Sequence, residues 1–280
     1  MRRFDLCVVN RVTVTAFDNK KPVGNATFTI GRHMTLQPKS LKWAETVSVS
    51  KAVIVGKAGG VAVALAVAPA KGVKASSTFP KGRKLGASAF SGRINYTAAV
   101  TKGKKLSSTV TYHWTFTKPG YSFSKLKLSS FAFRCDDTFY SRPNPARRTL
   151  SPGCAWTQAP AILDMSGLRE IAAGIRQVQA RGQHYERIGS PRPLHRQDDP
   201  VKQTDNRNAV CPRNAVPPAP GLSCDEYPFA STKEGGLRLA KEDRGTRWVP
   251  ASEQNQQGGK LTTFYKQYRV LVNDPFFVRA

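Results

Sequence analysis

Carboxylates are scarce in the first half of this sequence, and long apolar runs are absent. The 280 residues include 44 Lys and Arg but only 18 Asp and Glu, for a formal net charge of +26, and no carboxylate occurs between Glu45 and Asp136. The longest small-apolar run, residues 61–70, falls well short of the roughly 20 residues that a membrane-spanning helix needs. The composition therefore excludes a spanning helix and suits a polyanionic partner, such as nucleic acid, an anionic cell-wall polymer or an acidic membrane face. A basic but inert surface is the alternative.

The five cysteines lack any C-x-x-C spacing, which excludes a zinc ribbon. Four of them form two neighbouring couples, Cys135 with Cys154 and Cys211 with Cys224, and each couple flanks a turn-rich segment. Two local disulfides would suit this arrangement, although four cysteines allow three pairings. Cys7 is then left over. Disulfides indicate an oxidising compartment, so we expect a secreted protein.

The first ten residues do not form a signal peptide, because Asp5 and Asn10 interrupt their apolar stretch. For a secreted protein, we therefore expect the true start to lie upstream of Met1.

The charge distribution predicts two domains. Residues 1–130 carry 22 Lys and Arg with 3 Asp and Glu, a net charge of +19, whereas residues 131–280 carry 22 and 15, a net charge of +7. We place the boundary near residue 130. Apolar and polar residues alternate in segments 12–17, 26–30, 61–67 and 109–117, with turn residues between them. This two-residue period predicts an all-β, sandwich-like first domain that adds salt-sensitive attraction for a polyanion.

The second domain shows helical periods and a long connection. Residues 166–180 place apolar side chains on one helical stripe, with Ser166 as the N-cap. A proline-rich connection follows, and a disulfide between Cys211 and Cys224 would tie it down. The remaining order is strand, acidic loop, strand, helix from Pro250 onward, and a closing strand in RVLV and PFFV. This pattern predicts an α+β domain.

The acidic loop CDEYPFASTKEGG suggests a metal site. Asp225 and Glu226 end a strand, Glu234 precedes a Gly-Gly turn, and Asn255 lies in the first turn of the helix. Carboxylate and amide oxygens suit a hard cation such as Mg²⁺ or Mn²⁺. The spacing alone also fits an acidic surface loop. His195 competes for the role of general base, because its reference pKa is roughly 6.5, and it fits a structural or phosphate-contacting role equally well.

The run CDEYPFASTKEGG, followed by VPASEQNQQGGKLTTFY and RVLVNDPFFV, resembles the catalytic core of the NucA/NucB-type secreted deoxyribonucleases. The resemblance covers roughly residues 131–280 and extends to the upstream PLHR, DNRNAVC and RCDD segments. It implies a ββα-metal nuclease core in which an aspartate replaces the usual histidine base.

The resemblance implies roles by position. Asp225 is the general base with Glu226 beside it, and Asn255 is the metal ligand on the helix. Glu234 is either a further metal ligand or a carboxylate that contacts the ligands without binding the metal. The helix start reads Glu-Gln-Asn-Gln-Gln where members often have Asp-Asn-Arg, so the arginine that would contact phosphate is missing. The remaining candidates for substrate contacts are His195, Arg196, Arg244, Arg247, Gln257 and Lys260.

These observations predict a secreted, Mg²⁺- or Mn²⁺-dependent endodeoxyribonuclease without sequence preference, and no obligate protein partner. An aspartate with a reference pKa of about 3.9 is a weak base, so the metal should do most of the activation. The alternative, from another class, is a catalytically idle polycationic protein that binds DNA or a cell-wall polymer.

Overall fold

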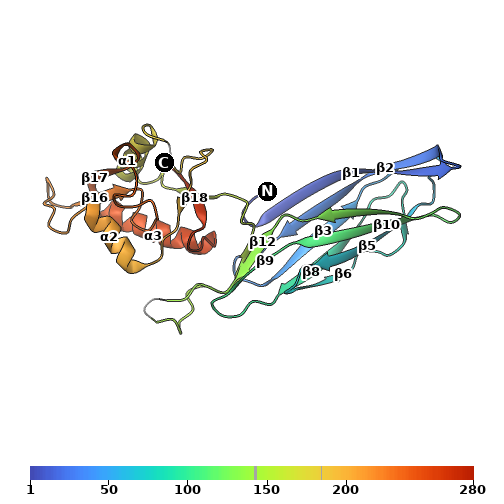
Figure 1. Ribbon diagram of the computed structural model, residues 1–280, viewed down its shortest axis with the longest axis horizontal. Helices are drawn as coiled ribbons and strands as arrows, with labels where there is room; N and C mark the ends of the chain where they lie inside the picture. Colours follow the sequence, from blue (N-terminus) through green and yellow to red (C-terminus); the bar gives the residue numbers. More distant parts are fainter. Residues whose placement is uncertain (142–143, 184) are drawn as a thin grey trace. The chain divides into compact units, whose positions relative to one another are not determined.

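The chain folds into two compact units, Met1–Ala159 and Pro160–Ala280 (Figure 1). The computed structural model describes residues 1–141, 144–183 and 185–280. Along the sequence, the boundary between the units follows Ala159, whereas the charge distribution predicts a boundary near residue 130. The reason is strand pairing: β12 (Phe133–Asp136) pairs with β9 (Lys105–Ser108) and with β13 (Gly153–Ala155). The backbones of β12 and β13 are therefore hydrogen-bonded within the first unit.

The first unit is built from antiparallel sheets. One sheet runs in the order β1-β2-β3-β8-β6, with β4 paired to β2, and a second runs β11-β10-β5-β7. Their bounds are β1 (Asp5–Asp18), β2 (Lys21–Thr35), β3 (Lys42–Val49), β4 (Val53–Gly56), β5 (Ala62–Pro69), β6 (Val73–Ser77), β7 (Arg83–Lys84), β8 (Phe90–Ala98), β10 (Val110–Thr117) and β11 (Ser124–Ser129).

The inner faces of these two sheets share one apolar core. Phe28 on β2 lies 5.9 Å from Phe116 on β10, measured between ring centroids. Along β10, Val110, Tyr112 and Trp114 are buried and alternate with less buried residues. The two-residue period of the sequence thus corresponds to a strand with one face in the core, and the strand-rich first unit is confirmed.

A buried carboxylate joins the two sheets. Glu45 on β3 accepts a hydrogen bond from the hydroxyl of Tyr96 at 2.6 Å and from that of Tyr112 at 2.8 Å. The Arg32 guanidinium lies 4.3 Å from the centre of the Tyr112 ring. Burial raises the pKa of Glu45, and the two hydroxyls and Arg32 oppose that rise. This carboxylate is fully hydrogen-bonded, so its role is structural.

The second unit combines three helices with short strands (Figure 1). Strand β18 lies between β14, its parallel neighbour, and β15, its antiparallel neighbour, while β16 and β17 form an antiparallel pair. Helices α1 and α3 pack against that pair. The bounds are β14 (Ala161–Asp164), α1 (Arg169–Gln179), β15 (Leu194–His195), α2 (Pro200–Val210), β16 (Leu222–Tyr227), the 3₁₀ turn η1 (Lys241–Asp243), β17 (Gly245–Pro250), α3 (Ala251–Gln267) and β18 (Pro275–Arg279).

Three local expectations need correction. The proline-rich connection contains helix α2, and RVLV forms the turn that follows α3, so the closing strand begins only at Pro275. The N-cap of α1 is Leu168, not Ser166. The cap hydrogen bonds come from another element, because the Glu253 carboxylate on α3 accepts the backbone N–H groups of Glu170 and Ile171 at 3.0 and 3.1 Å. Tertiary contact has replaced the local cap.

Within the described ranges, no helix is long and apolar enough to cross a membrane.

Candidate active site

Strand β16 carries two neighbouring buried carboxylates. Asp225 is 5% exposed and Glu226 is 6% exposed. In the antiparallel register, Asp225 lies opposite Arg247 and Glu226 opposite Thr246 on β17. Buried carboxylates are rare unless they are paired or hydrogen-bonded. The surroundings of these two side chains therefore define what the site can do.

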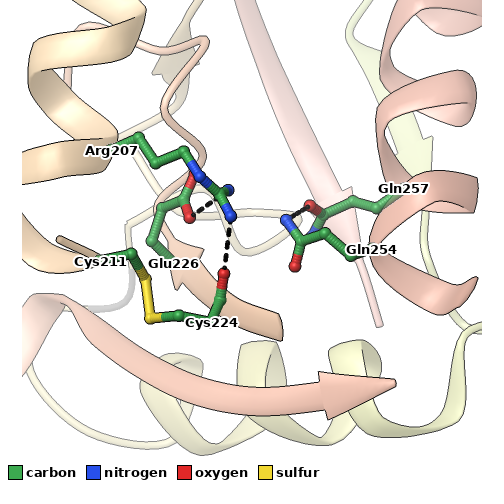
Figure 2. Close-up of a disulfide and its surroundings, with 6 residues drawn as sticks. All are labelled: Arg207, Cys211, Cys224, Glu226, Gln254 and Gln257. Atoms are coloured by element: carbon green, nitrogen blue, oxygen red, sulfur yellow. Dashed lines mark hydrogen bonds and ion pairs between the residues drawn. A yellow bond between two sulfur atoms is a disulfide. The ribbon is translucent and has the colours of Figure 1, made fainter. Parts of the chain in front are cut away.

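Helix α2 supplies the positive charge. Arg207 Nη1 lies 3.1 Å from Glu226 Oε2, and its Nη2 donates to the Cys224 carbonyl at 3.0 Å. The disulfide between Cys211 and Cys224 joins the C-terminal end of α2 to the start of β16. Figure 2 shows the Arg207 guanidinium between these partners. The disulfide therefore holds together the two elements that carry the ion pair.

Two glutamine amides from α3 approach the same region. Gln254 and Gln257 lie three positions apart, so they project from the same side of the helix, and Gln254 Nε2 donates to Gln257 Oε1 at 3.4 Å. Figure 2 shows both amides facing the Arg207 guanidinium. Among the described residues, Asp225 Oδ1, Gln254 Oε1 and Gln257 Nε2 are buried without a hydrogen-bond partner. Buried polar atoms of this kind usually have a hydrogen-bond partner, so these three need an explanation.

Burial shifts the titration of both acids. Burial raises the pKa of Asp225 to about 6, against the smaller lowering effects of Gln257, Gln254 and Arg207. Burial likewise raises the pKa of Glu226 to about 7, where Arg207 lowers it and the Asp225 charge raises it. The two acids thus titrate near neutral pH, the range in which a general base works well.

Glu234 is paired with His195 instead of completing an acidic cluster. Its Oε1 lies 2.7 Å from His195 Nδ1, and its Oε2 accepts the His195 backbone N–H at 2.8 Å. Both carboxylate oxygens therefore fix one histidine. In the part of the chain that the structure describes, no three or more His, Cys, Asp or Glu side chains form a group that could hold a metal ion.

The other predicted residues have separate environments. Asn255 is exposed on α3, one position away from the buried amide side of that helix. The Arg196 guanidinium lies over the Tyr265 ring and donates to the Val270 carbonyl. Arg247 donates to Glu170 at 2.6 Å, and Lys260 is exposed. Among the predicted substrate contacts, Gln257 acts on the Asp225 side chain, and Arg247 lies opposite Asp225 in the strand pair.

Arg207 has no place among the residues predicted from the sequence, although a local signal was present. The pair Asp199-Pro200 begins α2: the Asp199 carboxylate accepts the backbone N–H of Val201 at 3.0 Å, and Pro200 occupies the first turn. An N-cap aspartate followed by proline is typical of a helix start. Recognising α2 would have placed Arg207 one turn before Cys211 on the same helix.

A basic cavity lies beside Glu226. Its volume is ≈ 390 Å³, and its lining includes Arg181, Lys241 and Arg244 together with Glu226. Three cations against one carboxylate favour an anionic occupant. Arg244, one of the arginines considered from the sequence for phosphate contact, is part of this lining.

Comparison with known proteins finds a family match in this part of the chain. Residues 176–279, in the C-terminal part of the chain, match the model of the family described as Deoxyribonuclease NucA/NucB. No curated protein matches the chain. The matched range contains α2, β16, β17 and α3, and hence every residue of the Asp225 site. The match supports DNA nuclease activity.

The raised pKa of Asp225 predicts a stability gain on removing its charge. The folded pKa of about 6 exceeds the ordinary 3.8, so the native state binds this proton more tightly than the unfolded chain does. Stability is therefore lost as pH rises from about 4 to about 6. Asp225→Asn should raise the free energy of unfolding by on the order of 3 kcal/mol at pH 8, with no gain at pH 3.5. Calorimetry at both pH values measures this.

The control is Asp164→Asn, because Asp164 is exposed and its hydrogen bonds with Ser166 lower its pKa. That variant should gain no stability at pH 8. An Asp225→Asn protein as stable as the parent at pH 8 would show that burial of this charge costs nothing.

The disulfide between Cys211 and Cys224 should matter for activity as well as stability. It closes a sequence separation of 13 residues, which contributes about 3 kcal/mol in the chain-entropy model. The double variant Cys211→Ser/Cys224→Ser should melt at a lower temperature and cleave DNA more slowly at temperatures where it remains folded, because α2 no longer holds Arg207 against Glu226. Plasmid cleavage and circular dichroism measure the two effects.

The matched control is Cys135→Ser/Cys154→Ser in the first unit, whose sequence separation is 19. It should lose stability but keep its turnover on saturating DNA. Equal turnover in both double variants would disprove the link between this disulfide and the site.

Proposed function

We propose that the second unit is a divalent-metal-dependent endodeoxyribonuclease that hydrolyses phosphodiester bonds without sequence preference. The family match supports nuclease activity. The observation that carries the finer proposal is the buried Asp225 carboxylate, whose Oδ1 lacks a partner among the described residues and whose pKa is raised to about 6. Asp225 is then deprotonated above pH 6 yet is a stronger base than an ordinary aspartate. It is our candidate for the group that accepts a proton from the attacking water.

The available oxygens fit a hard cation. Asp225 Oδ1 and Gln254 Oε1 are both buried and unpartnered in the described chain, and Mg²⁺ is commonly held through one or two carboxylates while it keeps several waters. A cation also offsets the cost of ionising Asp225 beside Glu226. When bound, Mg²⁺ or Mn²⁺ would polarise the phosphodiester and stabilise the leaving oxygen. We assign a ligand role to Gln254 in place of the exposed Asn255, whereas Asp225 keeps the role of base.

The basic residues near the acids would bind the substrate. Arg181, Lys241 and Arg244 line the cavity beside Glu226, and they can contact phosphates on either side of the bond to be cut. Arg207 lies 3.1 Å from Glu226, where it lowers the pKa of that carboxyl, and it would compensate charge that develops on the phosphate. Contacts to phosphates carry no base information, so this arrangement favours cleavage without sequence preference.

Glu234 and His195 would act next to this centre and not within it. Because both oxygens of Glu234 are bonded to His195, Glu234 orients the imidazole. We assign His195 a phosphate contact through its other ring nitrogen, in accord with one of the roles that its loop position allows.

The order β16, β17, α3 provides two antiparallel strands followed by a helix, with the acids on the first strand and the amides on the helix. This arrangement supports a ββα-metal core. The two disulfides are consistent with an extracellular protein, and we propose that the protein is secreted.

Metal dependence and the role of Asp225 are tested together with supercoiled plasmid. The parent protein should nick and linearise the plasmid with Mg²⁺ or Mn²⁺ and stop when EDTA is added. Asp225→Asn should lower the cleavage rate at least about 100-fold, because it removes the base, while DNA retention in a gel stays nearly unchanged. Asp164→Asn, exposed in the same unit, should keep full activity.

Equal plasmid survival with metal and with EDTA would favour the idle DNA- or polymer-binding protein. In that case Asp225→Asn would change no measurable property of DNA retention or cleavage. Cleavage that persists at the parent rate in Asp225→Asn would instead assign the base to another residue.

A further inference from the structure

The outer face of the six-stranded sheet in the first unit contains a polar groove with no carboxylate in its lining. The groove has a volume of ≈ 730 Å³. The residues that matter here are His33, Lys42, Thr46, Arg93, Asn95 and Thr97, which we call the sheet groove. All six side chains are exposed. They belong to a unit that the family match does not cover.

Strand register places these side chains next to one another. His33 on β2 is paired with Thr46 on β3, and Thr46 is paired with Arg93 on β8. Lys42 is paired with Thr97 along the same two strands, β3 and β8. Paired residues on one face of an antiparallel sheet lie about 5 Å apart at their Cβ atoms. Because the strands are fixed by the core beneath them, the row of cationic and hydroxyl groups is preorganised.

The charge of the sheet groove is not neutralised locally. Lys42 has no described ion-pair partner, and the Arg93 side chain has one described contact, from its Nε to Asn95 Oδ1 at 3.1 Å. The nearest acid, Asp5, lies 2.7 Å from His33 Nε2 and also accepts the Thr35 hydroxyl. The carboxylate on β3, Glu45, points into the core and is bonded to Tyr96 and Tyr112. The terminal nitrogens of Arg93 and the Lys42 ammonium therefore face solvent and an incoming anion.

We propose that the sheet groove is a DNA-binding site that contacts the phosphodiester backbone. Lys42 and Arg93 would neutralise phosphates, and the hydroxyls of Thr46 and Thr97 would hydrogen-bond phosphate or sugar oxygens. A shallow row of this kind offers no element that could enter a DNA groove, so it reads no bases. The proposal rests on the proposed function only in the choice of DNA as the polyanion. It gives the first unit the task of holding the substrate that the second unit cuts.

The second sheet provides a matched control surface. Lys125 and Lys127 are exposed on β11, opposite Thr115 and His113 of β10, in the same unit but on the other sheet. Neutralising them removes the same number of charges from another face. If only the variant of the sheet groove loses DNA affinity, the loss comes from a specific site and not from the lower net charge of the protein.

The test measures binding without cleavage. Fluorescence anisotropy of a labelled DNA duplex is recorded in EDTA from 50 to 200 mM salt with the full chain, Lys42→Gln/Arg93→Gln and Lys125→Gln/Lys127→Gln. Each lost phosphate contact reduces the slope of log affinity against log salt by about 0.9. We expect the groove variant to lose about 2 in slope and at least about tenfold in affinity at 50 mM salt. The control variant should change affinity less than about threefold.

Equal losses in the two double variants, or no loss in the groove variant, would overturn the proposal, provided that circular dichroism shows both folded. A competition arm uses poly(glycerol phosphate) at equal phosphate concentration. Displacement of the duplex only by a large excess supports DNA as the ligand, and displacement as efficient as by unlabelled DNA overturns that choice.

The outcome is separable from that of the nuclease proposal. Binding in EDTA requires no catalysis. If the groove variant alone loses affinity and the parent protein never cuts plasmid, the nuclease proposal is disproved and the DNA-binding proposal for the sheet groove stands. With Mg²⁺, the groove variant should keep the parent kcat and show a raised KM, because it loses uniform binding only. A lowered kcat with unchanged KM would contradict the assignment.

Discussion

The C-terminal unit is organised around the cost of burying two adjacent carboxylates on one strand. Asp225 and Glu226 lose solvent, and burial raises both pKa values. Several features offset that cost in part: the Arg207 ion pair, the amides of α3, and a disulfide that fixes α2 to β16. Asp225 Oδ1, however, has no hydrogen-bond partner among the described residues. A charge left incompletely compensated in a rigid frame is suited to bind a cation and to accept a proton.

The chain buries acids in two different ways. In the first unit, Glu45 receives hydrogen bonds from two tyrosine hydroxyls and joins two sheets. In the second, Asp225 keeps one oxygen without a partner among the described residues. Both show a raised pKa caused mainly by burial. A shifted pKa alone therefore does not separate structure from chemistry, whereas the inventory of hydrogen-bond partners does.

The two units differ in their charged residues. The excess of lysine lies on a β unit whose sheet groove has no acid in its lining, and the acids are concentrated in the unit that carries the family match. Capture by many exposed cations is weakened by salt, whereas chemistry at a buried site is screened little.

Local sequence patterns by themselves predict several features of this protein. Period-two alternation predicts the strands of the first unit, the spacing of the cysteines indicates the two local disulfides, and the acidic motif locates β16. Only the tertiary structure decided the contact of Arg207 with Glu226, the facing of Gln254 and Gln257, and the pairing of Glu234 with His195. The physical reason is that one residue of helix rotation is about 100°. Packing of α3 on β16 and β17 sets that rotation, and it turns Asn255 to solvent.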